Sequence, residues 1–211
     1  MTTLSVRGLQ TSFPGPSGRV SVVDDLDFDI NPGEVLALVG ESGCGKTTVG
    51  RSLLRLVEPQ EGSVHYRGED LLKLDSTRLR QVRKKLQMVF QDPTTALDPR
   101  MRVREILTEG MLSFGIGTTE KDRTERAAEL LRTVRLDPRH LQRYPHEFSG
   151  GQRQRLGIAR ALSVEPELIV LDEAVSALDV SIQAQILNLL SDIQDRLGLA
   201  FLFITHDLSV V

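Results

Sequence analysis

The sequence predicts an α/β fold, because short apolar runs of strand length alternate with longer amphipathic runs of helix length. The strand-like runs are Val35–Val39, Leu168–Leu171 and Leu199–Thr205, and the helix-like runs are Thr48–Leu56 and Ser181–Leu197. Val35–Val39 and Leu168–Leu171 have the length and apolar character of buried strands. A polar loop follows each strand-like run. Because ligands of open α/β sheets bind beyond the carboxyl ends of the strands, these loops hold the candidate site.

The N-terminal residues predict antiparallel strands that pack on one face. Apolar residues recur along two runs, which are Leu4, Val6 and Leu9, and then Val20, Val22, Leu26, Phe28 and Ile30. Pro32-Gly33 marks a turn, and Ser63–Arg67 and Leu86–Phe90 have the pattern of further strands. The basic run Arg78–Lys85 alternates with apolar residues, which is typical of a helix with a solvated face.

Residues 92–147 change character and favour helices. Helical patterns cover Val103–Leu112 and Thr119–Val134, with Gly115 and Gly117 between them. A further helix leads from Ser149 to about Leu162. The run Ser181–Leu197 predicts a helix whose buried face carries Ile182, Ile186, Leu189, Leu190, Ile193 and Leu197. We therefore expect residues 1–91 and 148–211 to form an α/β core with an antiparallel β-subdomain, and residues 92–147 to form an inserted helical subdomain.

A glycine-rich loop with the chemistry of a phosphate site lies between Val35–Val39 and the helix that follows. The loop and the first helical residues are Gly40, Glu41, Ser42, Gly43, Cys44, Gly45, Lys46, Thr47 and Thr48. Glycines let the backbone curl and point its N–H groups inward, and the helix N-terminus adds its positive dipole end. Lys46 would contact the β- and γ-phosphates and Thr47 would ligate Mg²⁺, so we expect ATP and Mg²⁺.

Two carboxylates directly follow the run Leu168–Leu171. Asp172 would hold Mg²⁺, directly or through water, and Glu173 would polarise the attacking water as a general base. Taken alone, two acids after a strand more often form a solvated strand end. Beside a phosphate loop that contains Lys46, the catalytic interpretation is favoured.

The string Phe-Ser-Gly-Gly-Gln at residues 148–152 leads a helix. A helix N-terminus with a hydroxyl and free N–H groups is an anion site, although an ordinary N-cap also explains the serine. With this motif the chain resembles the ATP-binding cassette (ABC) family, the ATPase subunits of membrane transporters. Over nearly the whole chain, Gln91, Ser149–Gln152, Ser176–Asp179 and His206 match the Q-loop, signature, D-loop and switch histidine in the family's order.

The resemblance implies a P-loop NTPase fold, an ABC-type nucleotide-binding domain with a RecA-like core. It also implies that two such chains close head to tail over two Mg·ATP. Ser149, Gly151 and Gln152 of one chain would then cap the γ-phosphate held by the other chain. Asp179 would lie at the seam between the chains, or else only cap the next helix.

The same resemblance implies a hydrolytic set of Lys46, Gln91, Glu173 and His206. Gln91 would reach Mg²⁺ and the attacking water, so that Thr47, Gln91 and Asp172 surround the metal. His206 would contact the γ-phosphate, although a lone histidine after a strand is more often structural.

Four departures from the family pattern are visible. Phe148 stands where leucine is usual, and Ala174 where proline is common, and neither position carries a ligand. The aromatic that stacks on adenine is usually tyrosine; Phe13 is the best candidate here, and a core aromatic is the alternative. Because the sequence ends at Val211, soon after His206, we expect a C-terminal part of the family fold to be missing.

The flanks of the motifs resemble the branch of di- and oligopeptide importers, which also includes nickel importers. They are the residues around Gln91, the run Tyr144–Arg155 and the run Glu173–Gln185. The resemblance implies integral-membrane permease subunits, a second ATPase subunit and, indirectly, an extracytoplasmic solute-binding protein as partners. It places the chain peripherally at the cytoplasmic face of the cell membrane.

Composition agrees with these expectations. The chain has a net charge of −3 and a pI near 5.9, which argues against general nucleic-acid binding. No run of eighteen apolar residues and no secretory signal are present. The single cysteine, Cys44, cannot form an internal disulfide, and we expect it to be a small packing residue in a reducing cytosol.

Two other functions remain open beside the importer ATPase. An ABC-type ATPase that acts on DNA or ribosomes usually carries coiled-coil or zinc insertions, or a second cassette, and this sequence has neither heptads nor cysteine pairs. A regulatory subunit without turnover would lack part of the hydrolytic set, whereas Gln91, Glu173 and His206 are all present.

Overall fold

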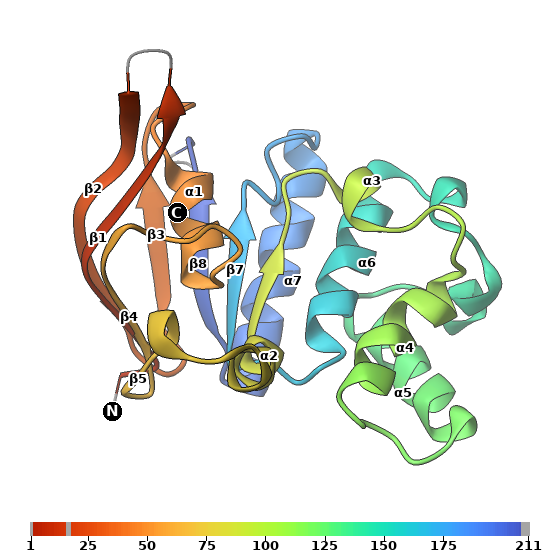
Figure 1. Cartoon of the computed structure of the whole chain (residues 1–211). Helices are drawn as coiled ribbons and strands as arrows, with labels where there is room; N and C mark the ends of the chain where they lie inside the picture. The colour runs from red at the N-terminus through yellow and green to blue at the C-terminus, as the bar shows by residue number, and fades with distance from the viewer. Residues whose placement is uncertain (1, 16–17, 208–211) are drawn as a thin grey trace. The chain divides into compact units, whose positions relative to one another are not determined.

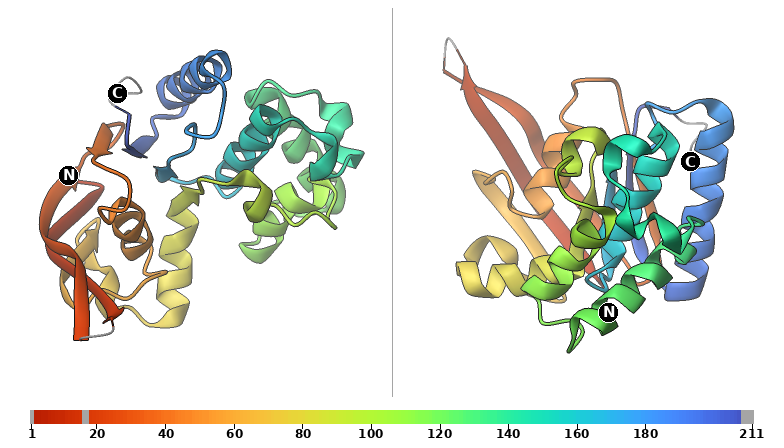
Figure 2. Two further views of the ribbon diagram at one scale, coloured as in Figure 1. Left: turned by 90° about the horizontal axis from the view of Figure 1, so that it is seen from above. Right: turned by 90° about the vertical axis from the view of Figure 1, so that its right-hand side faces the viewer.

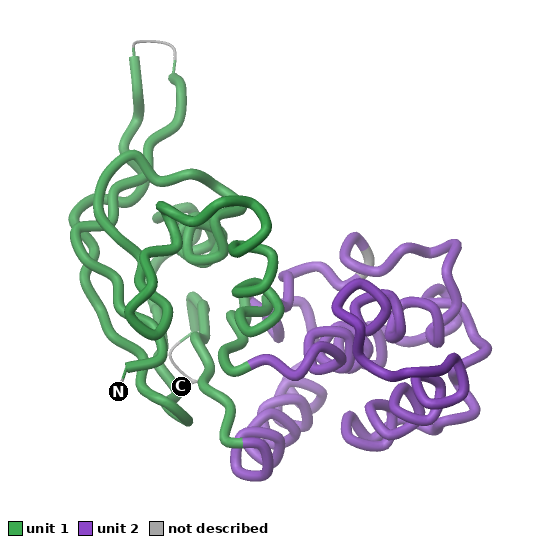
Figure 3. The backbone as a smooth tube through the Cα atoms, turned by 60° about the horizontal axis from the view of Figure 1, so that its bottom comes forward, with its two compact units in different colours: residues 1–88, 167–172, 198–211 green, residues 89–166, 173–197 purple. Residues whose placement is uncertain are grey.

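The computed structural model of the chain describes residues 2–15 and 18–207. The chain forms two compact units, which Figure 3 colours separately. Unit 1 comprises residues 1–88, 167–172 and 198–211, and unit 2 comprises residues 89–166 and 173–197. The division expected from the sequence, with its boundaries at residues 91 and 148, stays a prediction.

The N-terminal sheet of unit 1 is antiparallel, which confirms the prediction for this region. In order across the sheet it contains β2 (Gly18–Ile30), β1 (Leu4–Gly15), β4 (Glu61–Tyr66) and β5 (Glu69–Asp70) (Figure 1). The expected alternation along β2 is wrong near its start, where Val20 is 53% exposed and Val23 is buried. The pairing of β1 with β2 shifts register at three places, and each shift can exchange the faces of the strand.

The second sheet of unit 1 has the strand order β3 (Val35–Val39), β8 (Ala200–Thr205), β7 (Leu168–Asp172) and β6 (Leu86–Val89). The first three strands run parallel. β7 is buried throughout, but Val35 and Val39 are 46% and 37% exposed. Within the described residues, β3 pairs with a strand on one side only, so the prediction of a buried strand is wrong for its two ends.

Helix α1 (Lys46–Leu53) packs on this parallel sheet through a glycine. A Cβ on Gly50 would lie 2.8 Å from Cδ1 of Ile204 and 3.1 Å from Cγ1 of Val170. The close approach therefore depends on the absence of a side chain. The helix begins at Lys46, two residues before the start at Thr48 that the sequence pattern indicates.

The basic run of the sequence forms helix α2 (Ser76–Lys85), which follows a 3₁₀ turn at Leu71–Lys73. Asp75 caps the helix by accepting a hydrogen bond from the backbone nitrogen of Arg78 at 2.8 Å. Leu79 and Val82 are buried and the other side chains of the helix are exposed or half-buried, so the predicted amphipathic helix is confirmed.

A single carboxylate joins the two sheets of unit 1. Oε2 of Glu167, which precedes β7, accepts a hydrogen bond from the Tyr66 hydroxyl at 2.6 Å and pairs with Arg67 at 2.8 Å. Lys85, at the end of α2, lies 3.7 Å from Oε1. Burial and the bond to Glu167 raise the pKa of Tyr66, so the phenol remains a hydrogen-bond donor. The end of β4 is thereby held at the start of β7.

Unit 2 is helical. Its elements are α3 (Pro93–Ala96), α4 (Val103–Ser113), α5 (Glu120–Thr133), the 3₁₀ turns Pro138–Gln142 and Pro145–Glu147, α6 (Gly150–Leu162) and α7 (Val180–Leu197). Helices α4, α5 and α6 pack against one another (Figure 2), and each carries a fully buried side chain, which is Leu107, Leu131 and Ile158 in turn. The predicted helices are confirmed, although Leu197, which was expected on the buried face of α7, is 52% exposed.

Gly62 and Gly68 provide a test of how the antiparallel sheet is packed. Both have a positive φ, 91° and 87°, but a Cβ on Gly62 would lie 2.4 Å from the carbonyl oxygen of Gly8, whereas nothing lies within 4 Å at Gly68. Each alanine substitution forces the left-handed conformation at about 1–2 kcal/mol. We expect Gly62→Ala to lower the free energy of unfolding by at least about 2 kcal/mol more than Gly68→Ala. Urea unfolding measures both, and equal losses would contradict the observed packing.

Candidate functional site

The glycine-rich loop of unit 1 connects β3 to α1 and depends on its glycines at defined places. Gly43 and Gly45 have φ angles of 83° and 97°, in the region that glycine adopts without strain. A Cβ on Gly45 would lie 2.5 Å from the carbonyl oxygen of Val22, and one on Gly40 would lie 2.8 Å from Sγ of Cys44. Gly45 is therefore the position where only glycine fits this path, whereas Gly43 requires glycine for its φ alone and Gly40 meets only the movable end of the Cys44 side chain.

Lys46 is held at the centre of the loop. Its side chain is buried, and Nζ donates hydrogen bonds of 2.7 Å to the carbonyl oxygens of both Gly40 and Glu41. The sulfur of Cys44 lies 3.8 Å from the same nitrogen. Cys44 itself is exposed, so the expectation of a packing residue is wrong, and its thiol is open to reagents.

Thr47 and Asp172 meet at the end of the parallel sheet. The Thr47 hydroxyl donates a hydrogen bond of 2.8 Å to Oδ1 of Asp172, which is 2% exposed. A hydroxyl and a carboxylate are the oxygen ligands that Mg²⁺ accepts. The described residues contain no group of three or more His, Cys, Asp or Glu side chains that could hold a metal. Two protein ligands fit Mg²⁺ in particular, because this ion usually retains waters and phosphate oxygens.

His206 and Phe13 are the two remaining site candidates of unit 1. His206 directly follows β8 and is exposed, next to Asp207, whose backbone nitrogen donates to the Thr205 hydroxyl at 3.0 Å. Phe13 lies near the end of β1, opposite Val20, and is 39% exposed. The alternative interpretation of Phe13 as a core aromatic is therefore wrong. Its contact with adenine stays a prediction.

In unit 2 the structure brings Gln91 and Glu173 together. Nε2 of Gln91 donates a hydrogen bond of 3.0 Å to Oε2 of Glu173. Glu173 has a φ of 47°, which is uncommon for a residue with a side chain and costs about 1–3 kcal/mol, so the surrounding contacts must hold it. The backbone nitrogen and hydroxyl of Ser176 both donate to the Glu173 carbonyl oxygen, at 3.1 and 3.0 Å, and thus hold this turn.

The expected signature residues form the N-terminus of α6. Ser149 is the N-cap, and its hydroxyl accepts from the backbone nitrogen of Gln152 at 3.3 Å. The Gln152 side chain in turn accepts from the backbone nitrogen of Ser149 at 3.0 Å, which completes a capping box. Sequence reasoning missed this role of Gln152, although the S-x-x-Q spacing is a known signal for it.

Gly151 also has a structural reason. A Cβ there would lie 2.6 Å from Cγ2 of Ile182, in the first turn of α7. The cap and this close approach together account for Ser149, Gly151 and Gln152 without any ligand, so the purely structural alternative is stronger than the sequence suggested. It does not exclude an anion at the exposed helix N-terminus, where Gly150 carries no side chain to cover the backbone.

The D-loop aspartate, Asp179, begins α7. Its carbonyl oxygen accepts from the backbone nitrogens of Ile182 and Gln183, both at 2.9 Å, and the residue is exposed. Asp179 therefore starts the helix with its main chain, as the structural alternative expected. A role of its side chain at a seam between two chains stays a prediction.

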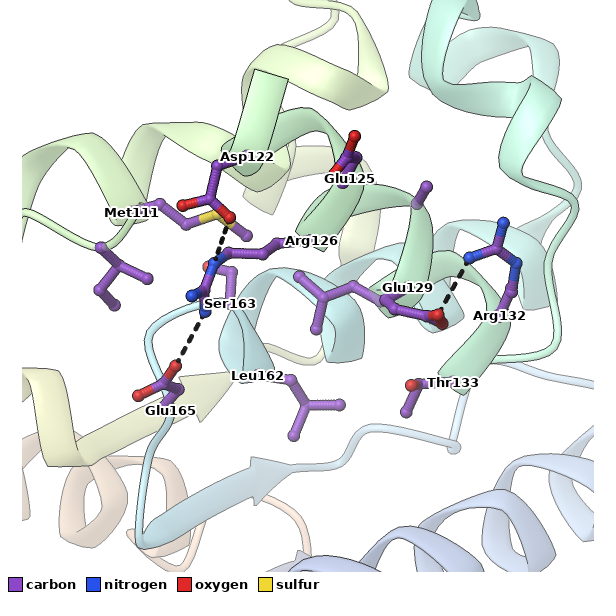
Figure 4. A pocket seen from close by; sticks show the side chains of 13 residues that line it. Met111, Asp122, Glu125, Arg126, Glu129, Arg132, Thr133, Leu162, Ser163 and Glu165 are labelled. Carbon is purple, nitrogen blue, oxygen red and sulfur yellow. Dashed lines mark hydrogen bonds and ion pairs between the residues drawn. The ribbon is translucent and has the colours of Figure 1, made fainter. Parts of the chain in front are cut away.

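A hollow of about 700 Å³ in unit 2 does not include any of these residues (Figure 4). Helix α5 and the end of α6 line it. Most of its charged side chains pair with one another: Arg126 lies 3.0 Å from Asp122 and 3.5 Å from Glu165, and Arg132 lies 3.1 Å from Glu129. Glu125 pairs with Lys121 outside the hollow. The hollow therefore offers little unpaired charge to a phosphate chain.

In the part of the chain that the structure describes, no helix combines the length and the apolar character needed to span a bilayer.

Comparison with known proteins gives consistent relatives. The oligopeptide transport ATP-binding protein OppF of Bacillus subtilis is 54% identical over 209 residues, which is 99% of this chain and 68% of OppF. A protein of Brucella ovis named as a peptide import ATP-binding protein is 56% identical over 208 residues, and the chain spans only 65% of its length.

Solved structures agree with the fold. The ATP-binding cassette MJ0796, in a dimeric post-hydrolysis state bound to ADP and Pi, matches with a TM-score of 0.88 and 28% identity, over 98% of this chain and 89% of that one. CbiO1 of Clostridium perfringens, part of the ABC transporter complex CbiONQ, matches with a TM-score of 0.83 and 25% identity, over all of this chain and 80% of that one. The family model described as ABC transporter matches residues 23–176. This chain therefore belongs to the ABC transporter family.

Proposed function

We propose that this chain is the ATPase subunit of an ABC importer, which hydrolyses ATP to drive the uptake of di- or oligopeptides. The observation that carries the proposal is the phosphate loop around Lys46 beside the Thr47–Asp172 pair. Phosphate binding needs an ammonium and inward-facing backbone, and Mg²⁺ needs hard oxygen ligands. The peptide cargo rests on the names of relatives such as OppF.

Each residue of the proposed site has a distinct role in phosphoryl transfer to water. Thr47, Asp172 and Gln91 would hold Mg²⁺, which would supply neutralisation of phosphate charge when bound. Lys46 exchanges its two carbonyl contacts for phosphate oxygens. Glu173 accepts the proton of the attacking water. His206 donates a hydrogen bond to the γ-phosphate.

A second ATPase chain, identical or homologous, completes the site in this proposal. Ser149, Gly151 and Gln152 place the N-terminus of α6 toward the γ-phosphate held by the partner, and Asp179 lies at the seam. The dimeric state described for the similar cassette MJ0796 supports this arrangement. Phe13 stacks on the adenine of its own nucleotide.

The remaining partners follow from an importer. They are integral-membrane permease subunits and, indirectly, an extracytoplasmic solute-binding protein, which puts the chain at the cytoplasmic face of the cell membrane. Nickel or another small solute is the alternative cargo, since nothing in an ATPase subunit contacts the solute. An ABC-type ATPase outside transport is the more distant alternative. Copurification with membrane proteins, rather than with nucleic acid, distinguishes an importer ATPase from an ABC-type ATPase outside transport.

Replacing Lys46 tests ATP binding. We expect Lys46→Ala to weaken Mg·ATP binding by about 2–4 kcal/mol, because the phosphates lose a charge-assisted partner. Lys73→Ala, an exposed lysine of unit 1, is the matched control and should leave affinity unchanged. Calorimetry measures both. ATP should also slow alkylation of the exposed Cys44, and an alkylation rate that ignores ATP, together with unchanged affinity, would refute the placement of the phosphates.

Replacing Glu173 tests its role as general base. Glu173→Gln keeps the size and hydrogen-bonding capacity of the side chain but cannot accept a proton, so ATP should still bind while steady hydrolysis falls by about 10²–10⁴-fold. The variant should accumulate as a dimer with ATP, which size-exclusion chromatography detects. Hydrolysis at the wild-type rate would assign the base elsewhere.

Replacing Ser149 tests completion of the site by a second chain. Ser149→Arg removes the cap of α6, at about 1 kcal/mol of stability, but leaves the phosphate loop of its own chain intact. ATP affinity of the monomer should therefore stay nearly unchanged, while hydrolysis is abolished because the new side chain crowds the partner's γ-phosphate. In a homodimer, mixing Ser149→Arg with Lys46→Ala should restore part of the activity, since one composite site then has both sound residues. Loss of ATP binding by monomeric Ser149→Arg would mean that Ser149 serves its own nucleotide or the fold.

A further inference from the structure

Gln154 is a buried polar side chain that the proposed mechanism does not use. It lies in α6, two residues after Gln152 of the capping box, and is 1% exposed. Within the described part of the chain its Nε2 has no hydrogen-bond partner. Arg104 and His140 also have a buried nitrogen without a partner, but both residues are partly exposed. An unpaired amide donor is unfavourable in the interior, so the side chain of Gln154 calls for an explanation.

The neighbours of α6 define where this side chain points. A Cβ on Gly157 would lie 3.9 Å from Cγ1 of Val89, and one on Gly151 would lie 2.6 Å from Cγ2 of Ile182. With 3.6 residues per turn, Gln154 lies about 60° around the helix from each of these two positions. Its side chain therefore points between the segment that follows Val89 and the first turn of α7. We call the space between these two segments the wedge, and the segments its walls.

Both walls of this wedge lead directly to the Gln91–Glu173 pair. Gln91 comes two residues after Val89, and Glu173 begins the turn that runs into α7 at Val180. The 3.0 Å bond between the Gln91 amide and the Glu173 carboxylate joins the two walls. Gln154 thus lies on the face of α6 between the two segments that carry these side chains.

The main chain on the Gln91 side is the better acceptor for the Gln154 amide. On the other wall, the carbonyl oxygen of Glu173 already accepts from Ser176, and that of Val175 accepts from Leu178 and Gln183. Beyond β6, the chain at Phe90–Gln91 is outside regular secondary structure, where a carbonyl can turn toward a donor.

We propose that Gln154 is a positioning residue: when ATP binds, its amide donates to the main-chain carbonyl of Phe90 or Gln91 and fixes the Gln91 side chain for hydrolysis. The inference rests on the proposed function and extends it. The bond that the structure leaves unmade forms as Gln91 releases Glu173 and turns to the nucleotide. The signature helix and the Q-loop then move together, because one side chain connects them.

Gln154→Leu tests this role, because leucine fills nearly the same space and has no donor. In the purified full chain, kcat for ATP should fall about tenfold while KM changes less than about twofold. The melting temperature without nucleotide should stay the same or rise, since an unpaired buried donor has been removed. A merely structural role would instead lower the melting temperature together with the activity.

A second measurement follows the backbone around Gln91, residues 89–93. In a Glu173→Gln background, which prevents turnover, ATP should slow hydrogen exchange of the backbone amides of residues 89–93, and Gln154→Leu should abolish that protection. Gln142→Leu makes the same change at an exposed glutamine of unit 2 and should alter neither kcat nor exchange. If Gln154→Leu does not fold, Gln154→Met keeps an unbranched side chain without a donor.

Three results would overturn the inference. Wild-type kcat in Gln154→Leu, or retained protection of residues 89–93, would show that the amide does not position Gln91. A fall in kcat that is matched by a fall in melting temperature would make Gln154 structural only. If the wild-type chain binds ATP but never hydrolyses it, the proposed function itself fails; if the wild type and Gln142→Leu both hydrolyse ATP, a contrary result in Gln154→Leu overturns this inference alone.

Discussion

The parallel pairing of β3, β8 and β7 is the constraint on which the site of unit 1 depends. Val39 lies opposite Thr205, and Ile204 lies opposite Asp172, so three strands end at the same edge of the sheet. These strand ends place the phosphate loop, His206 and Asp172 at one edge of the sheet, although these residues are far apart in the sequence. The register fixes the strand ends, and the glycine-rich loop after Val39 then brings the Thr47 hydroxyl to 2.8 Å from Asp172.

Close backbone approach is the second constraint, and it explains why glycine recurs near the site. Gly45 lies against Val22, Gly50 against Ile204 and Gly151 against Ile182, each at a distance that any Cβ would violate. At Gly50 and Gly151 the approach presses a helix onto its neighbour. At Gly45 it presses a strand of the antiparallel sheet onto the phosphate loop. The same glycines that free the backbone N–H groups therefore also set the positions of the elements that carry them.

The sequence predicts the strands and helices well, because their apolar periodicity reflects local geometry. It also predicts which residues meet in unit 1, since parallel strands bring their carboxyl ends together and Thr47 follows one of them. It fails for the exposed ends of β3, because burial of a strand depends on neighbours that the strand's own pattern does not encode. It fails at Val20 and Val23 for a related reason: a register shift in the pairing with β1 is invisible in alternation alone.

The polar contacts of unit 2 lie beyond sequence reasoning in a different way. Nε2 of Gln91 lies 3.0 Å from Oε2 of Glu173, yet no periodicity in the sequence relates the two residues. The φ of 47° at Glu173 could not be predicted either, because a positive φ is usually recognised in a sequence by a glycine.

The N-terminus of α6 illustrates how one set of groups can serve both fold and ligand. Ser149 and Gln152 satisfy two backbone donors through the capping box, which stabilises the first turn whether or not an anion is present. A hydroxyl oxygen has two lone pairs and also carries a proton, so accepting from Gln152 leaves the Ser149 hydroxyl able to donate to a phosphate oxygen. The cap therefore pre-organises the helix end, and an incoming γ-phosphate meets a donor array whose conformational entropy has already been lost on folding.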